Sequence, residues 1–463
     1  MTVGLPLSFT CDMLRKVHVP QGLTDSASSL CTAVLWIALS VGLTSCGRAA
    51  PEHSLPQGRP TGQQSAGRPS ATSPSPQAQS FYTDDFHKTP TVPGMTRVGR
   101  LLFFDPALSK SGKLACSTCH DPAFAFGPAP SSKRAAALQG VVMDRAIPSL
   151  RYMQDIPPFS EHHFDESADE SVDQGPTGGH MWDGRADTLH DQAKLPLFSP
   201  REMANANADE VVQNVRQGAY AASMREVFGE DVFDDPKRGF KAILKALEVF
   251  QQSPPEFYPY NSKYDAWLRN QTKLTSLELR GLAVFNDPAK GNCASCHPSQ
   301  VRGGSFPQFT DFGYVAVGVP RNRMLASNKD PDYYDLGLCG PLRSDFKDHP
   351  QYCGRFKAPT LRNVSLRQTF FHNGVMTDLR KVLEFYAERD TNPEKFYKGH
   401  AAPRKFDDLP AAYRDNVNVE PPFGGKPGSP PSFTKADIAA LSAFLATLTD
   451  GYDPPKSDPV GRQ

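Results

Sequence analysis

Two short copies of one motif carry most of the chemistry that this 463-residue chain can do. Both copies follow the pattern C-x-x-C-H: CSTCH at residues 116–120 and CASCH at residues 293–297. The two thiols of such a motif add to the vinyl groups of a haem, and the histidine that follows binds the iron. A zinc or redox C-x-x-C site is the alternative, but such a site does not need the adjoining histidine. We therefore predict two covalently bound c-type haems, held by the following residues: Cys116, Cys119, His120, Cys293, Cys296 and His297.

The segments before the two motifs resemble each other. GRLLFFDP at residues 99–106 and GLAVFNDP at residues 281–288 share Gly, Phe, Asp and Pro in the same register. This recurrence indicates a duplicated unit, in which an amphipathic helix leads into each cysteine loop.

Other helix signals agree with a mainly α fold of two cytochrome c-like domains with long loops. One apolar stripe predicts a helix from Arg238 to Gln252, which the pair Pro254-Pro255 ends. Capping boxes at Thr275-x-x-Glu278 and Thr434-x-x-Asp437 open two further helices. We place the two haem domains at residues 80–262 and 272–450, followed by a tail at residues 451–463.

The overall charge is balanced, with 50 Lys and Arg against 50 Asp and Glu. The chain therefore has no net positive charge that would favour nucleic acid as a partner. The apolar run at residues 30–43 is too short for a confident membrane span, and Leu-Thr-Ser-Cys46 follows it like a bacterial lipobox. We predict a lipoprotein signal peptide over residues 1–45, a lipid on Cys46, and a disordered Pro/Ser/Gly linker over residues 46–79. Such a protein is periplasmic and contacts the membrane only through its lipid anchor.

The remaining cysteines fit an oxidising compartment. Cys11 and Cys31 leave with the signal peptide, which leaves only Cys339 and Cys353 unassigned. We expect these two to form a disulfide, with free thiols as the alternative.

Over residues 95–450 the chain resembles the bacterial dihaem cytochrome c peroxidases, including the MauG-type oxidases. The resemblance rests on the haem motifs with Phe103-Phe-Asp-Pro and on five further matches: WDGRA at 182–186, Gln192, PREM at 200–203, PTLRN at 359–363 and FHNG at 371–374. It implies that Glu202 moves protons at the peroxide-binding face of the first haem, that Gln192 orients the peroxide, and that Pro196 shapes the pocket. Without its neighbours, Glu202 would be an ordinary carboxylate at a helix N-terminus.

The resemblance also assigns roles around the two haems. Trp182 would lie between them and carry electrons, although a buried indole is first of all a packing group. His372 and Arg362 would bind haem, with Arg185 and Arg362 acting as salt-bridge or propionate partners.

Three departures from the classical peroxidases are informative. Residues 121–161 contain no His that could cap the first iron, and His162 and His163 lie in an acidic, exposed run, so the first haem should be open. Tyr386 stands where the classical family has the Met that is the sixth ligand of the second haem, as in the MauG-type enzymes. Met376 is the alternative ligand, and Tyr386 could instead be a helix core residue.

The third departure concerns calcium, which the family binds between the haems. The Asn of that site is Ala146 here, and its two carbonyl positions fall at Arg367 and Thr369. Calcium is therefore doubtful, and the charge of Arg367 could replace it.

These features predict a haem-dependent oxidoreductase of the cytochrome c peroxidase type, which reduces hydrogen peroxide at the first haem. Its electrons would come from a small donor protein, either a cytochrome c or a cupredoxin. A MauG-like oxidase, in which a high-valent dihaem state oxidises residues of a protein substrate, is the first alternative. The second is a dihaem electron carrier without turnover, and the third is a small-molecule sensor.

Overall fold

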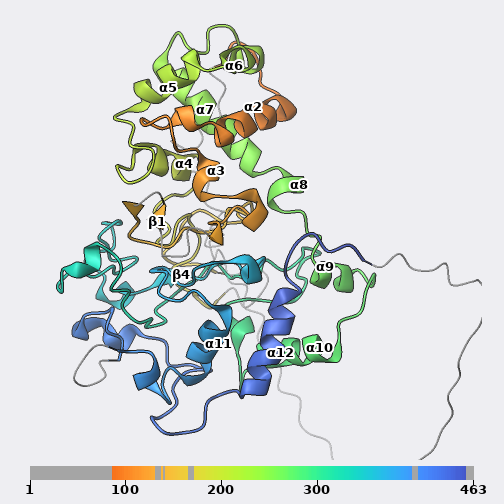
Figure 1. Cartoon of the computed structure of the whole chain (residues 1–463), viewed down its shortest axis with the longest axis vertical. Coiled ribbons are helices and arrows are strands. Elements are labelled where there is room, and N and C mark those ends of the chain that lie inside the picture. The colour runs from red at the N-terminus through yellow and green to blue at the C-terminus, as the bar shows by residue number, and fades with distance from the viewer. Residues whose placement is uncertain (1–85, 131–136, 139–140, 165–170, 399–404, 455–463) are drawn as a thin grey trace, which may run out of the picture. The chain divides into compact units, whose positions relative to one another are not determined.

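The computed structural model describes residues 86–130, 137–138, 141–164, 171–398 and 405–454, which all belong to one compact unit (Figure 1). The predicted signal peptide, the lipid site at Cys46 and the linker lie outside the described residues. No helix among the described residues is long and apolar enough to cross a membrane.

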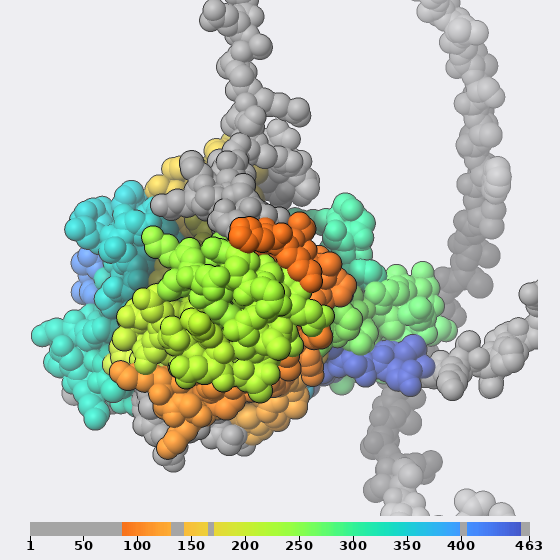
Figure 2. Space-filling model, turned by 90° about the horizontal axis from the view of Figure 1, so that it is seen from above, coloured from red at the N-terminus to blue at the C-terminus, as the bar shows by residue number. Residues whose placement is uncertain are grey.

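The part of the chain up to residue 257 is a group of helices around the first haem motif (Figure 1). These helices are α2 (Val92–Phe104), α3 (Cys116–Cys119), α4 (Leu189–Phe198), α5 (Ala208–Gln217), α6 (Ala221–Phe228), α7 (Pro236–Gln251) and α8 (Pro254–Phe257). Figure 2 shows that this part, coloured orange to lime green, covers the upper face of the molecule. We call it the first half.

The second half follows from residue 263 and has a similar plan. Its α-helices are α9 (Lys263–Leu268), α10 (Ser276–Asn286), α11 (Leu379–Glu388) and α12 (Lys435–Ala446). Short 3₁₀ helices occur in both halves at Pro106–Leu108, Pro122–Phe124, Cys293–Ser295, Ser327–Lys329, Pro350–Tyr352, Val364–Leu366, Pro393–Lys395 and Ala411–Asn416.

Sheet structure is limited to two short antiparallel pairs among the described residues. Strand β1 (Ala137–Leu138) pairs with β2 (Val141–Val142), and β3 (Tyr314–Val315) pairs with β4 (Phe356–Lys357). In the second pair, Tyr314 stands opposite Lys357. The mainly α prediction is therefore confirmed for the described part of the chain.

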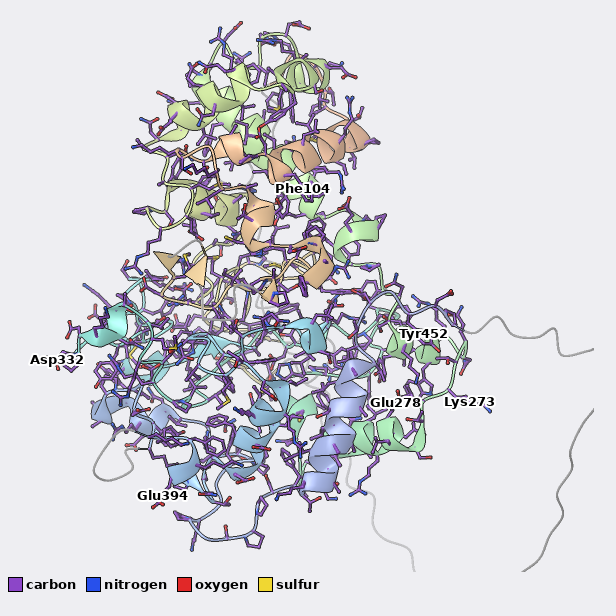
Figure 3. The ribbon with its side chains drawn as sticks, in the orientation of Figure 1. Phe104, Lys273, Glu278, Asp332, Glu394 and Tyr452 are labelled. Carbon is purple, nitrogen blue, oxygen red and sulfur yellow. A yellow bond between two sulfur atoms is a disulfide. The ribbon has the colours of Figure 1, made fainter. Side chains whose placement is uncertain are left out.

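The helix boundaries follow from local capping. Helix α10 begins after Thr275, whose hydroxyl accepts the N–H of Glu278 while the Glu278 carboxylate accepts the N–H of Thr275, as predicted; Glu278 is labelled in Figure 3. Helix α12 begins with the same box at Thr434 and Asp437. Helix α7 begins two residues before the predicted Arg238, because Asp235 caps it and Pro236 fits the first turn.

The duplication is visible in the packing of both halves. In the first half, Phe103 packs edge-on against Phe126 and Phe250, at centroid distances of 5.7 and 5.4 Å. The matching ring in the second half, Phe285, packs in the same way against Phe309 and Phe444, at 6.2 and 5.1 Å. These rings belong to separate hydrophobic clusters, within residues 86–257 and 264–448, so each half has its own core.

Polar contacts join the two halves beside these cores. Arg151 and Tyr152 of the first half both contact the carboxylate of Asp450, at 2.8 and 2.6 Å. Nearby, Arg145 forms a two-pronged ion pair with Asp335, which lies 190 residues later in the sequence. These contacts hold the loops of residues 145–152 against the second half.

Candidate haem sites

The first haem motif lies on a single helical turn, α3, which presents both cysteines. His120 follows it, and its Nδ1 lies 2.9 Å from the carbonyl oxygen of Phe126. This hydrogen bond places the proton on Nδ1 and leaves Nε2 as the nitrogen that can bind iron. Burial lowers the pKa of His120 to about 4, so the ring is neutral, which is the form that binds a metal.

The second motif repeats this arrangement. His297 follows the 3₁₀ turn Cys293–Ser295, and its Nδ1 lies 2.8 Å from the carbonyl oxygen of Phe309. Burial again lowers the pKa of the histidine to about 4. Phe126 and Phe309 are the matching rings of the two cores, so each half orients its histidine with the equivalent carbonyl group.

The zinc alternative receives no support from these surroundings. A structural zinc site needs four ligands, and no cluster of three or more His, Cys, Asp or Glu with metal-site geometry occurs among the described residues. Burial raises the pKa values of the Cys116 and Cys293 thiols to about 12.

A mostly apolar cavity opens beside the second motif, and its chemistry fits a haem. On one side are Cys293, Cys296 and His297, and aromatic and aliphatic side chains form much of the wall. His372 also lines it, stacked on the ring of Phe356 at 3.5 Å, with a buried Nε2 that has no hydrogen-bond partner. The nearest carboxylate, Asp408, is 3.9 Å from this nitrogen, and a haem propionate would be a closer acceptor for it.

Tyr386 lines the same cavity from helix α11. Its ring lies between those of Phe371 and Phe423, with centroid distances of 6.2 and 5.3 Å. Burial raises the pKa of its phenol, and the nearby Cys296 and Cys293 thiols raise it further. Met376 is not among the lining residues of this cavity and packs against two hydrophobic clusters instead. The structure thus brings Tyr386 to the second haem site.

Helix α4 and the turn after it carry the residues predicted to handle peroxide. Pro196 lies inside α4 and has no N–H to donate to the carbonyl group of Gln192, so this turn is open. The chain then folds back, and the N–H of Met203 donates to the Pro196 carbonyl at 3.1 Å. This return places Glu202 after the helix, on the side of the first haem motif.

Glu202 is half-buried, and its negative charge acts on the cysteines of the first haem motif. Burial raises the pKa of its carboxyl group, while a hydrogen bond with Ser199 and the charge of Arg185 act in the opposite direction. Its negative charge in turn raises the pKa values of the Cys116 and Cys119 thiols. A carboxyl group whose pKa is raised by burial therefore lies near the first haem motif.

Trp182 connects the first half to the second haem site. Its indole N–H donates to the carbonyl oxygen of Ala146 at 2.8 Å, and its own carbonyl accepts the N–H of Lys357 at 2.9 Å. It is 9% exposed, packs with Ala146 and Phe356, and lines the second cavity. Both the packing role and a position on the route between the haems agree with this geometry.

The arginines differ from expectation in one respect. Arg362 is fully buried and donates through both terminal nitrogens to Asp265, at 2.9 Å each, and through Nε to the Pro307 carbonyl. These contacts are those of a salt bridge, and Arg362 does not line the second cavity, so its haem-binding role stays a prediction. Arg185 likewise pairs with Asp183, at 2.8 Å.

Two further predictions concern the loops. His162 is exposed and pairs with Asp173 at 2.6 Å, which agrees with a surface role. Cys339 and Cys353 are joined in a disulfide, which closes the loop that follows Asp335.

Sequence reasoning missed a group of charged residues at the second cavity. Lys357, Asp335 and Asp408 line it, and Arg145 holds Asp335 and Asp183 together. Because these residues are far apart in the sequence and share no motif, no sequence signal pointed to them.

The chain is similar to proteins of known function. Residues 93–273 match the family of di-haem cytochrome c peroxidases. The chain is 34% identical over 389 residues to the methylamine utilization protein MauG of Paracoccus denitrificans, covering 79% of this chain and 91% of that protein. It is 28% identical over 310 residues to the cytochrome c551 peroxidase of Nitrosomonas europaea, covering 66% and 76%. The solved structure of the diheme peroxidase BthA from Burkholderia thailandensis matches with a TM-score of 0.69 at 40% identity, over 78% of this chain and 87% of that one.

Proposed function

Because the chain belongs to the dihaem cytochrome c peroxidase and MauG family, we propose that it is a periplasmic peroxidase with two c-type haems. Hydrogen peroxide is reduced at the haem of the first motif, and electrons arrive through the haem of the second motif. The observation that carries this proposal is the position of Glu202, a half-buried carboxyl group whose charge reaches both thiols of the first motif.

Reduction of hydrogen peroxide to two water molecules consumes two electrons and two protons. When bound, the haem supplies an iron that takes up the peroxide and passes electrons to it. The protein must take a proton from one peroxide oxygen and deliver a proton to the departing one. Glu202 is suited to both tasks, because burial raises its pKa and brings its protonation closer to neutral pH. Gln192 orients the peroxide, and Pro196 shapes the pocket around it.

Trp182 would lie on the route of electrons from the second haem to this site. The indole lines the second cavity and is hydrogen-bonded to Ala146 of the first half, which supports this role. A small cytochrome c or a cupredoxin is the proposed donor. Export is part of the same proposal, with a lipid on Cys46 as the anchor.

A second function is favoured by Tyr386. A phenolate ligand stabilises oxidised iron, whereas a thioether ligand raises the reduction potential. Tyr386 would help to hold the iron of the second haem, which would then supply an oxidising equivalent for residues of a protein substrate, in the manner of MauG. A dihaem electron carrier remains the proposal from another class, and it predicts no reaction with peroxide.

The test is a stopped-flow optical and EPR experiment on the fully oxidised holoprotein with one equivalent of hydrogen peroxide. A rapid spectral change that starts from mixed high-spin and low-spin ferric haem supports an open first haem. A reaction that occurs only after one haem has been reduced would indicate a hidden sixth ligand and a reductively activated peroxidase. If neither state reacts, the electron carrier is correct. Subsequent turnover with a reduced cytochrome c or cupredoxin separates the peroxidase from the protein oxidase.

A further inference from the structure

Arg367 lies between the two haem motifs. Its side chain lines the cavity that contains Cys293, Cys296 and His297. Its Nη2 donates to the carbonyl oxygen of Ile147 at 3.2 Å, on the chain segment that also approaches His120. The positive charge of Arg367 is close enough to His120 to oppose protonation of that ring. One guanidinium therefore acts on the surroundings of both haems.

The contacts of Arg367 are with carbonyl groups, which are also the groups that bind a hard metal cation. Besides Ile147, its Nε donates to the carbonyl oxygen of Thr369 at 3.4 Å. Thr369 is one of the two carbonyl positions of the family's calcium site, and Ala146 offers a methyl group where that site has an Asn side chain. Calcium takes six to eight oxygen ligands, so the residues present do not fit it.

Arg367 also has no carboxylate partner within the described part of the chain. No Asp or Glu there forms an ion pair with it, although other arginines near the cavity, such as Arg145 and Arg321, are paired. Burial lowers the pKa of the guanidinium to about 10, so it keeps its charge at neutral pH. The carboxylates that line the same cavity, Asp335 and Asp408, are paired with Arg145 and Arg321. Arg367 is therefore free to pair with an anion that the haem brings, and the haem propionates are such carboxylates.

We infer that Arg367 is the resident cation between the two haems, that it takes the place of a divalent metal ion, and that a haem propionate is its counter-ion. This inference rests on the proposed function only in assuming that both haems are present. A fixed positive charge beside a haem stabilises the reduced iron, because reduction removes one positive charge from the site. Arg367 therefore raises the midpoint potential of the neighbouring haems.

The test uses the holoprotein without peroxide, so its outcome is independent of the peroxidase proposal. Midpoint potentials of both haems are measured by spectroelectrochemistry for the wild type, Arg367→Gln and Arg367→Lys. Arg380→Gln is the matched control, because it removes the same charge from an exposed position on α11. We expect Arg367→Gln to lower the potential of at least one haem, while Arg367→Lys and Arg380→Gln stay close to the wild type.

Calcium is measured on the same wild-type sample by elemental analysis after dialysis and by calorimetric titration with calcium chloride. We expect no stoichiometric calcium and no binding heat. One tightly held calcium per chain, or unchanged potentials in Arg367→Gln, would overturn the inference. If Arg367→Gln fails to incorporate haem, the calcium measurement on the wild type still decides whether Arg367 takes the place of the metal ion.

Discussion

Gly281 of α10 meets Ala440 of α12 so closely that a Cβ atom built on Gly281 would lie 2.1 Å from the Ala440 carbonyl oxygen. The first half has the same contact, because a Cβ atom on Gly99 of α2 would lie 2.0 Å from the carbonyl oxygen of Ala246 in α7. The glycine that recurs before each haem motif thus marks the point where α2 crosses α7 in the first half and where α10 crosses α12 in the second. The close crossing also brings the ring of Phe285 to that of Phe444.

We expect Gly281→Ala to destabilise the second half, because the added methyl group has no room at the crossing. Overpacking of this kind costs about 1–3 kcal/mol, although alanine favours a helix more than glycine does. Thermal unfolding of the holoprotein measures the effect. The control is Ala283→Leu, which adds a larger side chain to the exposed side of the same helix and should change little. A Gly281→Ala variant as stable as the wild type would contradict the close crossing.

Glu202→Gln should slow the reaction with peroxide by about 10²–10⁴-fold, because an amide cannot take up and release the proton. The haem spectra of the ferric protein should not change. Burial raises the pKa of Glu202. As the pH is lowered, the wild-type rate should therefore begin to fall at a higher pH than it would with an ordinary glutamate. The Gln variant should lack this inflection. Glu230→Gln removes an exposed carboxylate of the same half and serves as the control.

Tyr386→Met should raise the midpoint potential of the second haem, because a thioether replaces a phenolate as the ligand. Tyr386→Phe should leave that haem without its sixth ligand and make it high-spin in EPR spectra. Met376→Leu should alter neither property, since Met376 does not line the cavity. Tyr413→Met, at a half-buried tyrosine outside the lining, controls for the substitution itself. A spectral change in Met376→Leu with none in Tyr386→Phe would reverse the ligand assignment.

The features that sequence could predict are local ones. Capping at Thr275 and Thr434 depends on residues three positions apart, and each haem motif spans five residues. The residues that contact one another are therefore close in the sequence, where a short motif can reveal them. The shared Gly and Phe before each motif likewise indicated the duplication, because two helices that cross in the same way need the same residues at the crossing.

The features that sequence could not predict depend on distant partners. Arg362 is predicted from the sequence to bind haem, and no sequence signal indicates that its guanidinium pairs with Asp265, 97 residues earlier in the chain. Arg145 and Asp335 are 190 residues apart. No periodicity links such pairs, and only the folded chain decides which carboxylate meets which arginine. The same is true of Lys357, which lines the second cavity although its two neighbours in the sequence are apolar.

Asp437 links the cap of α12 to α10, and this contact should make the second half sensitive to acid. Its carboxylate accepts hydrogen bonds from the Thr434 N–H at 3.0 Å, from the Thr434 hydroxyl at 2.8 Å and from Arg280 at 2.8 Å. Burial alone would raise its pKa, but the hydrogen bonds from Arg280 and Thr434 outweigh burial and lower the pKa to about 2.

A carboxyl group with a lowered pKa in the folded state stabilises the protein above its unfolded pKa of about 4. That contribution is lost as the pH falls from about 4 to about 2. Asp437→Asn should therefore reduce the stability at pH 7, by about 1 kcal/mol for the cap alone. The difference in stability between the variant and the wild type should disappear as the pH falls through this range. Asp332→Asn, at an exposed carboxylate labelled in Figure 3, should show no such gap. Chemical denaturation at several pH values measures both, and a gap that stays constant down to pH 2 would show that the charge of Asp437 does not stabilise the fold.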